Sequence, residues 1–117
     1  MLEREKDSIN RIIQESVPGK QVTIAHVIAS PMMEIYERLG IENMGAIGLM
    51  TITPNEAAII AADVVTKSAD VKIGFLDRFT GSLIISGDVE SVETALKATS
   101  ETLEALLGFS INPITRT

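Results

Sequence analysis

The sequence predicts an α+β fold, and three features of the 117-residue chain lead to this prediction. Short runs carry the alternation or the β-branched residues of strands, whereas longer stretches repeat apolar residues every three or four positions, as on a helix face. Turn-forming residues separate these segments. Because two of the runs flank a short polar turn, we expect a compact antiparallel sheet with helices packed on one face. A chain of this length buries about two-thirds of its unfolded surface, which is enough for one core.

The first strand and helix are predicted after a Pro-Gly turn at residues 18–19. The strand spans residues 22–28, and we expect both of its faces to be buried because the side chains on both are largely apolar. One face is predicted to carry Val22, Ile24, His26 and Ile28. Ser30 and Pro31 form the pattern of an N-cap and a first helical residue, and Gly40 suits the end of this short helix.

A second strand and a longer helix follow. Residues 46–52 form an almost wholly apolar run, which indicates a buried strand, and Gly48 within it indicates a bulge or a close backbone approach. Residues 53–56 (TPNE) match a capping box with proline at the first helical position, so a helix is predicted from there to Ser68. Its core-facing stripe is predicted to contain Ala57, Ile60, Ala61 and Val64.

The last third of the chain predicts a hairpin and a long helix. Residues 71–76 and 82–86 are expected to pair around the polar turn 77–81. Asp88 is predicted to cap the final helix, whose apolar stripe continues until Gly108. The remaining tail contains a proline and is expected to be extended.

Composition excludes several classes of function. The net charge of -6 and the scarcity of aromatic residues (3%) argue against nucleic-acid binding, which needs clustered cations and stacking platforms. The chain has no cysteine, so disulfides, thiolate metal sites and a cysteine nucleophile are excluded. The longest apolar stretch, residues 44–52, is too short for a membrane span, and the charged N-terminal residues do not suit a signal peptide. We therefore expect a cytoplasmic protein with no membrane partner.

The residues offer little for catalysis or for metal and cofactor binding. His26 is the one histidine, and its place within an apolar strand favours a hydrogen-bonded core residue over a catalytic group or metal ligand. The carboxylates of Asp63, Asp70, Asp77 and Asp88 lie at predicted helix and strand ends, where such groups usually cap or are solvated. We therefore predict a protein that is not an enzyme and has no cofactor or metal. A small-molecule-binding or regulatory module with 77–81 as its ligand loop, and a small enzyme using His26, remain as alternatives.

Several long motifs resemble one known family. Residues 46–96, AIGLMTITPNEAAIIAADVVTKSADVKIGFLDRFTGSLIISGDVESVETAL, are similar to the shell domain of bacterial microcompartments, in which a small-residue strand leads through an Ala-rich helix ending in a Lys-x-Ala-Asn-type motif to a Gly-containing loop and a Gly-Asp-Val helix start. The stretch RIIQESVPGKQVTIAHVIASP, with GFLDRFTG and the terminal ITRT, resembles the circularly permuted single-domain members of the EutS and PduU type. The chain is thus expected to comprise a charged arm, residues 1–11, and one permuted shell domain, residues 12–117.

The resemblance implies a structural protein rather than an enzyme. It implies homohexamers that tile with other shell proteins into the polyhedral wall of a metabolic organelle in the bacterial cytoplasm, enclosing a set of enzymes and limiting metabolite passage. Shells for ethanolamine, propanediol and choline utilization are equally compatible with the sequence.

The resemblance also implies roles for particular residues. In the KSAD motif it assigns Lys67 and Asp70 to the hexamer edge, together with Ser30, which stands where the family commonly has an arginine. It assigns the turn residues Phe79, Thr80 and Gly81 to the rim of a pore on the sixfold axis. It assigns the N-terminal segment to a small barrel between subunits over this axis, with a clasp onto the same subunit as the alternative. The barrel candidates are Ile12, Ile13, Gln14, Glu15 and Val17.

Overall fold

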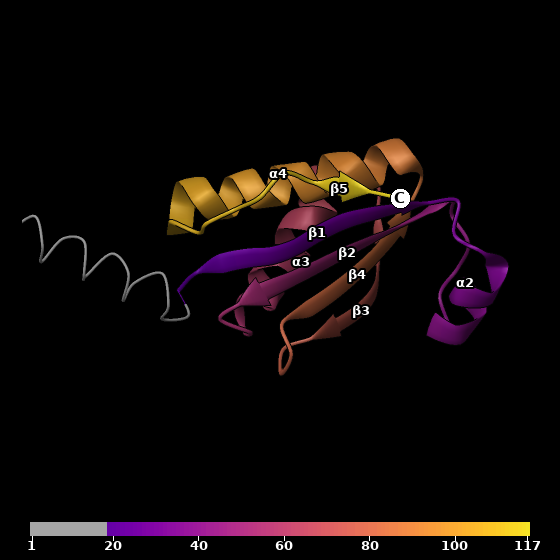
Figure 1. Ribbon diagram of the computed structural model, residues 1–117, viewed down its shortest axis with the longest axis horizontal. Helices are drawn as coiled ribbons and strands as arrows, with labels where there is room; N and C mark the ends of the chain where they lie inside the picture. Colours follow the sequence, from indigo (N-terminus) through magenta and orange to yellow (C-terminus); the bar gives the residue numbers. More distant parts are fainter. Residues whose placement is uncertain (1–18) are drawn as a thin grey trace, which may run out of the picture.

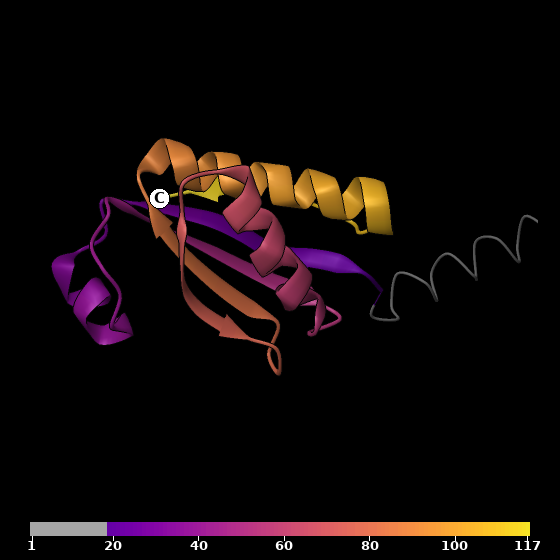
Figure 2. The ribbon, with the colours of Figure 1, turned by 180° about the vertical axis from the view of Figure 1, so that it is seen from behind.

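The computed structural model describes residues 19–117, and these residues form one sheet with helices on one of its faces (Figures 1 and 2). The α+β prediction is confirmed. The elements follow in the order β1 (Gln21–Ala29), α2 (Met33–Leu39), β2 (Ala46–Thr53), α3 (Ala57–Ser68), β3 (Lys72–Asp77), β4 (Ser82–Gly87), α4 (Val89–Leu107) and β5 (Thr115–Arg116). The predicted barrel candidates, residues 12–17, lie outside the described part of the chain, as does the charged arm.

The strands lie in the order β3-β4-β2-β1-β5. The first three pairings in this order are antiparallel, whereas β5 runs parallel to β1 at the far edge. Figure 2 shows α3 and α4 side by side over the same face, and α2 lies beyond the end of the sheet. The predicted hairpin is therefore one edge of the sheet, and the extended tail supplies the other.

The core lies between the sheet and the two long helices. It is built from aliphatic side chains of β1, β2 and β4 and from the inner faces of α3 and α4, including the fully buried Val27, Ile85 and Leu96. A Cβ atom added at Gly48 would lie 2.8 Å from side-chain atoms of both Ile85 and Val92, so the predicted close approach at this glycine is confirmed. Burial of these apolar side chains supplies the main free-energy gain of folding.

Helix ends agree with the sequence only where the signal is local. Asp88 caps α4 by accepting a hydrogen bond from the Ser91 amide at 2.8 Å, and Gly40 and Gly108 end their helices with left-handed backbone, as predicted. The capping box is wrong, because residue 53 is still the end of β2 and α3 begins at Ala57 without a side-chain cap. Ser30 is not an N-cap either: its amide closes the end of β1 by donating to the Gly45 carbonyl, and α2 begins at Met33.

Two predictions about buried faces are also wrong. A bulge in β1 shifts the alternation between Val22 and Ile24, so Val22 is buried while Ile24 is 49% exposed. The expected burial of both faces of β1 therefore does not hold within the subunit. In α3 the predicted Ala57 and Ala61 are buried, but Ile60 is 45% exposed and Val64 is only partly buried, so the prediction is wrong for these two residues. The buried residues of this helix are Ala57, Ala58, Ala61, Ala62 and Val65.

Candidate assembly surfaces

The polar turn between β3 and β4 is fixed by its own hydrogen bonds. Asp77 accepts one from the Phe79 amide at 2.8 Å and one from the Thr80 hydroxyl at 2.9 Å. These two bonds stabilise the carboxylate and hold the pKa of Asp77 below its ordinary value. The turn is tied to the loop between β2 and α3, because Asn55 donates its side-chain N–H to the Phe79 carbonyl at 2.6 Å. Asp77 therefore has a structural role at this position.

Gly81 completes the same turn, and its backbone requires glycine. Its φ of 76° lies in the left-handed region, and an added Cβ atom would collide with the carbonyl oxygen of Ile52. The Gly81 carbonyl in turn accepts a hydrogen bond from the Ile52 amide at 2.9 Å. The pore candidates Phe79, Thr80 and Gly81 thus lie on a rigid turn held against the end of β2.

The histidine lies under the C-terminal strand. Its Nδ1 is 2.6 Å from the Thr115 hydroxyl, and its Nε2 is 2.9 Å from the Thr117 hydroxyl. Both ring nitrogens are thereby engaged, in agreement with the prediction of a hydrogen-bonded residue, although the ring is only half-buried. His26 fastens β5 to the sheet in this arrangement.

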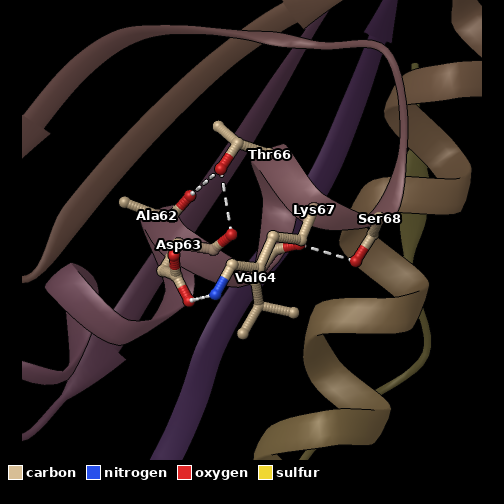
Figure 3. Close-up of polar contacts among 6 residues, drawn as sticks. All are labelled: Ala62, Asp63, Val64, Thr66, Lys67 and Ser68. Carbon is tan, nitrogen blue, oxygen red and sulfur yellow. Dashed lines mark hydrogen bonds and ion pairs between the residues drawn. The ribbon is translucent and has the colours of Figure 1, made fainter.

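Lys67 lies in the last turn of α3 and is exposed (Figure 3). Its ammonium group pairs with the Asp63 carboxylate one helical turn earlier, at 2.8 Å. Thr66 and Ser68 donate hydrogen bonds to helix carbonyls and so complete the polar end of this helix. The sequence motif suggested Asp70 as the neighbouring carboxylate, but the ion pair is with Asp63.

The edge candidates and the pore candidates lie at opposite ends of the strands. Strand pairing aligns Ile28 with Ile47, Ser86 and Lys72 in one row across the sheet. Ser30 comes two residues after Ile28, and Lys67 comes five residues before Lys72, so both lie near this row. The turn 77–81 lies at the other end, beside the end of β2. We call these the outer end and the inner end of the subunit.

The sequence did not predict the surfaces at the two edges of the sheet. Ile59, Leu76 and Phe79 are exposed at the hairpin edge. At the opposite edge, a groove of about 570 Å³ lies between α4 and the tail that leads into β5. Apolar residues that fall outside the buried stripe of α3 were a usable signal for the first surface, whereas nothing in the sequence pattern marks the groove.

Two further observations concern residues 19–117, the part of the chain that the structure describes. No cluster of three or more potential metal ligands occurs among them. None of their helices is sufficiently long and apolar to cross a membrane.

The subunit is similar to known proteins over nearly its whole length. Residues 46–115 match the BMC domain family. The bacterial microcompartment shell protein CutR of Streptococcus intermedius is 56% identical over 112 residues, which cover 96% of this chain and 97% of the relative. The shell protein PduU of Salmonella typhimurium is 54% identical over 109 residues, covering 92% of this chain and 94% of the relative.

Solved structures agree with these relatives. A flat hexamer of CutR superposes with a TM-score of 0.82 at 56% identity, covering 92% of this chain and 98% of that chain. A screw form of CutR with a 41.9 Å pitch also gives a TM-score of 0.82, at 53% identity, with 86% of this chain and all of that chain covered.

The fold, the exposed sheet edges and these matches define a structural assembly module. The chain belongs to the BMC domain family. Within this family it is a bacterial microcompartment shell protein of the circularly permuted single-domain class.

Proposed function

We propose that this shell protein forms a cyclic homohexamer, and that the hexamer is a tile which joins other shell proteins in a microcompartment wall in the bacterial cytoplasm. The observation that carries the proposal is the similarity of the subunit, over 92% of this chain, to the chain of the CutR flat hexamer. Exposed apolar side chains at the hairpin edge support it, because contiguous apolar surface on a soluble subunit usually marks a contact with another protein.

The two ends of the subunit receive different roles in this proposal. The inner end points to the sixfold axis, where Thr80 and Gly81 form a rim that limits passage and Phe79 lies at the side of this rim that faces the next copy. The outer end carries Lys67, Asp70 and Ser30 to the border between hexamers. The opposite placement of these two groups along the strands supports this division.

Lys67 is suited to a border at which like-charged copies meet. Asp63, 2.8 Å from the ammonium group, offsets part of its charge and leaves the remaining N–H donors free for the neighbouring tile. Since the side chain is exposed, the pair itself adds little to subunit stability. Lys67 is therefore available for assembly.

The N-terminal segment is proposed to cover the axis. The described chain begins at Gly19, beside the inner end, because Gln21 pairs with the end of β2 at Thr53. Residues before it are therefore attached at the end that faces the axis. Pairing of Ile12, Ile13, Gln14, Glu15 and Val17 between subunits would give a closed barrel without free edges.

We also propose that the protein has no catalytic role. Both ring nitrogens of His26 are engaged by threonine hydroxyls, and the similar proteins are shell proteins. Native mass spectrometry over a range of salt concentrations, followed by electron microscopy of the assemblies, tests the proposed function. Hexamers that grow into flat sheets are expected, whereas a monomer at every salt concentration would contradict the proposed tile.

A further inference from the structure

The two edges of the sheet differ, and together they supply what a ring needs. A cyclic assembly of identical subunits uses two different surfaces on each copy. We propose that the hairpin edge (Ile59, Leu76, Arg78 and Phe79) of one copy packs into the tail groove of the next copy. The tail groove lies between α4, at Ser100, Glu101 and Glu104, and the segment 111–114. This inference rests on the proposed hexamer and assigns the contact that closes it.

The hairpin edge is an exposed apolar surface with one cation. Exposed fractions are 49% for Ile59, 39% for Leu76 and 75% for Phe79. The Arg78 guanidinium lies over the Phe79 ring, 4.9 Å from its centroid, so the two side chains extend together. In the described chain β3 pairs only with β4, and residues 41–42 contact β3 at Lys72 and Gly74, whereas Leu76 nearer the turn stays exposed.

The tail groove is a hollow with one apolar and one polar wall. Ile111, Pro113 and Ile114 form the apolar wall, and α4 forms the polar one. Its volume of about 570 Å³ falls in the range of pockets that enclose whole ligands, so several side chains can enter it. Ser100, on the α4 wall, is only 2% exposed, so the exposed Glu101 and Glu104 form the accessible part of this wall.

The two surfaces lie at the same level along the strands. One row of paired residues crosses the sheet from Leu76 through Leu83 and Met50 to Ala25. The tail runs beside Ala25, because Gln21 pairs with Ser110 and His26 pairs with Thr115. The groove segment 111–114 is therefore opposite the hairpin edge across the sheet. A rotation about an axis beyond the inner end therefore brings the hairpin edge of one copy to the tail groove of the next copy. Neither surface has to shift along the strand direction.

Both surfaces also lie on the helix-covered side of the sheet. Leu76 pairs with the buried Leu83, and its neighbour in the same hollow is Ile59 of α3. The groove has α4 as its wall, and both helices cover one face (Figure 2). A planar ring keeps this face on the same side in every subunit, so the two surfaces can meet.

The charges of the two surfaces are complementary. Arg78 has no ion-pair partner within the described chain, and the same is true of Glu101 and Glu104. Insertion of the hairpin edge would place the guanidinium beside these two carboxylates. Lys97 also lines the groove, so the groove's two carboxylates and one ammonium group give a net charge of -1, which is opposite in sign to Arg78. The contact therefore combines apolar packing between the two surfaces with one ionic contact, between Arg78 and the carboxylates of Glu101 and Glu104.

A charge exchange tests this contact without disturbing the fold. One variant carries Arg78→Glu, and the other carries Glu101→Lys with Glu104→Lys; all three side chains are exposed. Each variant alone would place like charges in every contact, so we expect the concentration at which hexamers form to rise at least tenfold. An equimolar mixture has opposite charges in every mixed contact. It is expected to form hexamers that contain three copies of each variant, which native mass spectrometry resolves by mass.

The matched control is Arg38→Glu, which makes the same reversal in an exposed arginine of α2 that is paired with Glu34. This variant is expected to remain hexameric, and circular dichroism is expected to show an unchanged fold for all variants. If the wild type is hexameric but the single variants assemble normally, or if the mixture stays dissociated, the contact is wrong although the hexamer stands. A wild type that stays monomeric contradicts both proposals.

Discussion

The turn at the inner end shows how much structure single residues impose. Asp77 fixes the turn through its two hydrogen bonds, and Gly81 turns the chain where a side chain does not fit. Neither residue needs a ligand to account for its presence. Their arrangement holds Phe79 outward, so local chemistry determines which side chains are available for assembly.

Replacing Gly81 by alanine is expected to destabilise the subunit more than the same change at Gly108. Both glycines have left-handed backbone, with φ values of 76° and 71°, and this conformation costs an alanine about 1–2 kcal/mol. Only at Gly81 does the new Cβ atom meet a backbone oxygen, whereas nothing lies within 4 Å of it at Gly108. The overpacking adds about 1–3 kcal/mol. Urea unfolding at one fixed protein concentration measures the difference, and equal losses at the two positions would contradict the proposed clash.

Acid is expected to weaken the turn and the start of α4 together. Hydrogen bonds from the Ser91 amide and hydroxyl lower the pKa of Asp88, as those from Phe79 and Thr80 lower the pKa of Asp77. A carboxyl whose pKa is lower in the folded state stabilises the fold above its unfolded pKa, which is about 3.9 for aspartate. This contribution is lost as the pH falls through the lower, folded value.

The variant Asp77→Asn with Asp88→Asn retains acceptor oxygens at both positions but does not titrate there. Its free energy of unfolding is therefore expected to fall less steeply than that of the wild type as the pH falls below about 4. Urea midpoints between pH 5 and pH 3 give the two slopes. Parallel curves would show that these hydrogen bonds do not distinguish the charged carboxylates from the neutral ones.

At the scale of elements, β5 depends on side chains as much as on backbone pairing. It contains two residues, and its backbone bonds to β1 are extended by those between Thr117 and both Val27 and Ala29. A strand this short forms few ladder bonds, so the contacts of His26 with two threonine hydroxyls account for much of its position.

Replacing His26 by alanine is expected to loosen β5 while the core remains intact. The amides of Thr117 and Ala29 make the terminal bonds of this pairing, and their hydrogen exchange is expected to accelerate at least tenfold. The matched control is Ile24→Ala. It shortens a half-exposed side chain on the same strand, β1, and removes no hydrogen bond to β5. Unchanged exchange at Thr117 would show that the backbone alone holds the strand.

The sequence predicted elements well where each one is determined by nearby residues. The cap of α4 needs only an amide three residues away, and the prediction for Asp88 is confirmed. The match to a capping box at residues 53–56 failed because the pairing of Thr53 with Gln21, 32 positions earlier, keeps this residue in a strand. The bulge that exposes Ile24 likewise depends on the register with β2.

The candidate surfaces follow the same rule. The ion pair of Lys67 with Asp63 spans one helical turn and was within reach of the sequence, although the motif drew attention to Asp70. The tail groove joins α4 to residues that come after it and cross the sheet to lie beside β1, so its walls depend on the whole topology. Periodicity contains no information about such a hollow.

At the scale of the whole molecule, the subunit is a body with distinct inner and outer ends and two unlike sides. The sides would close a ring, and the outer ends would join rings into a layer. In this proposal the two contacts are made by separate residues, so a substitution at the outer end is expected to affect the layer and leave the ring unchanged.

Lys67→Glu is expected to abolish or strongly reduce flat sheets while hexamers persist. The substitution places a second carboxylate one turn from Asp63, on a helix end that is exposed and remote from both the hairpin edge and the tail groove. Repulsion at this surface position changes subunit stability little, but at a border each tile would present two anions to its neighbour. Native mass spectrometry measures the hexamer and electron microscopy measures the sheets; sheets of normal extent in the Lys67 variant would remove this residue from the border, whereas loss of the hexamer would place it in the ring.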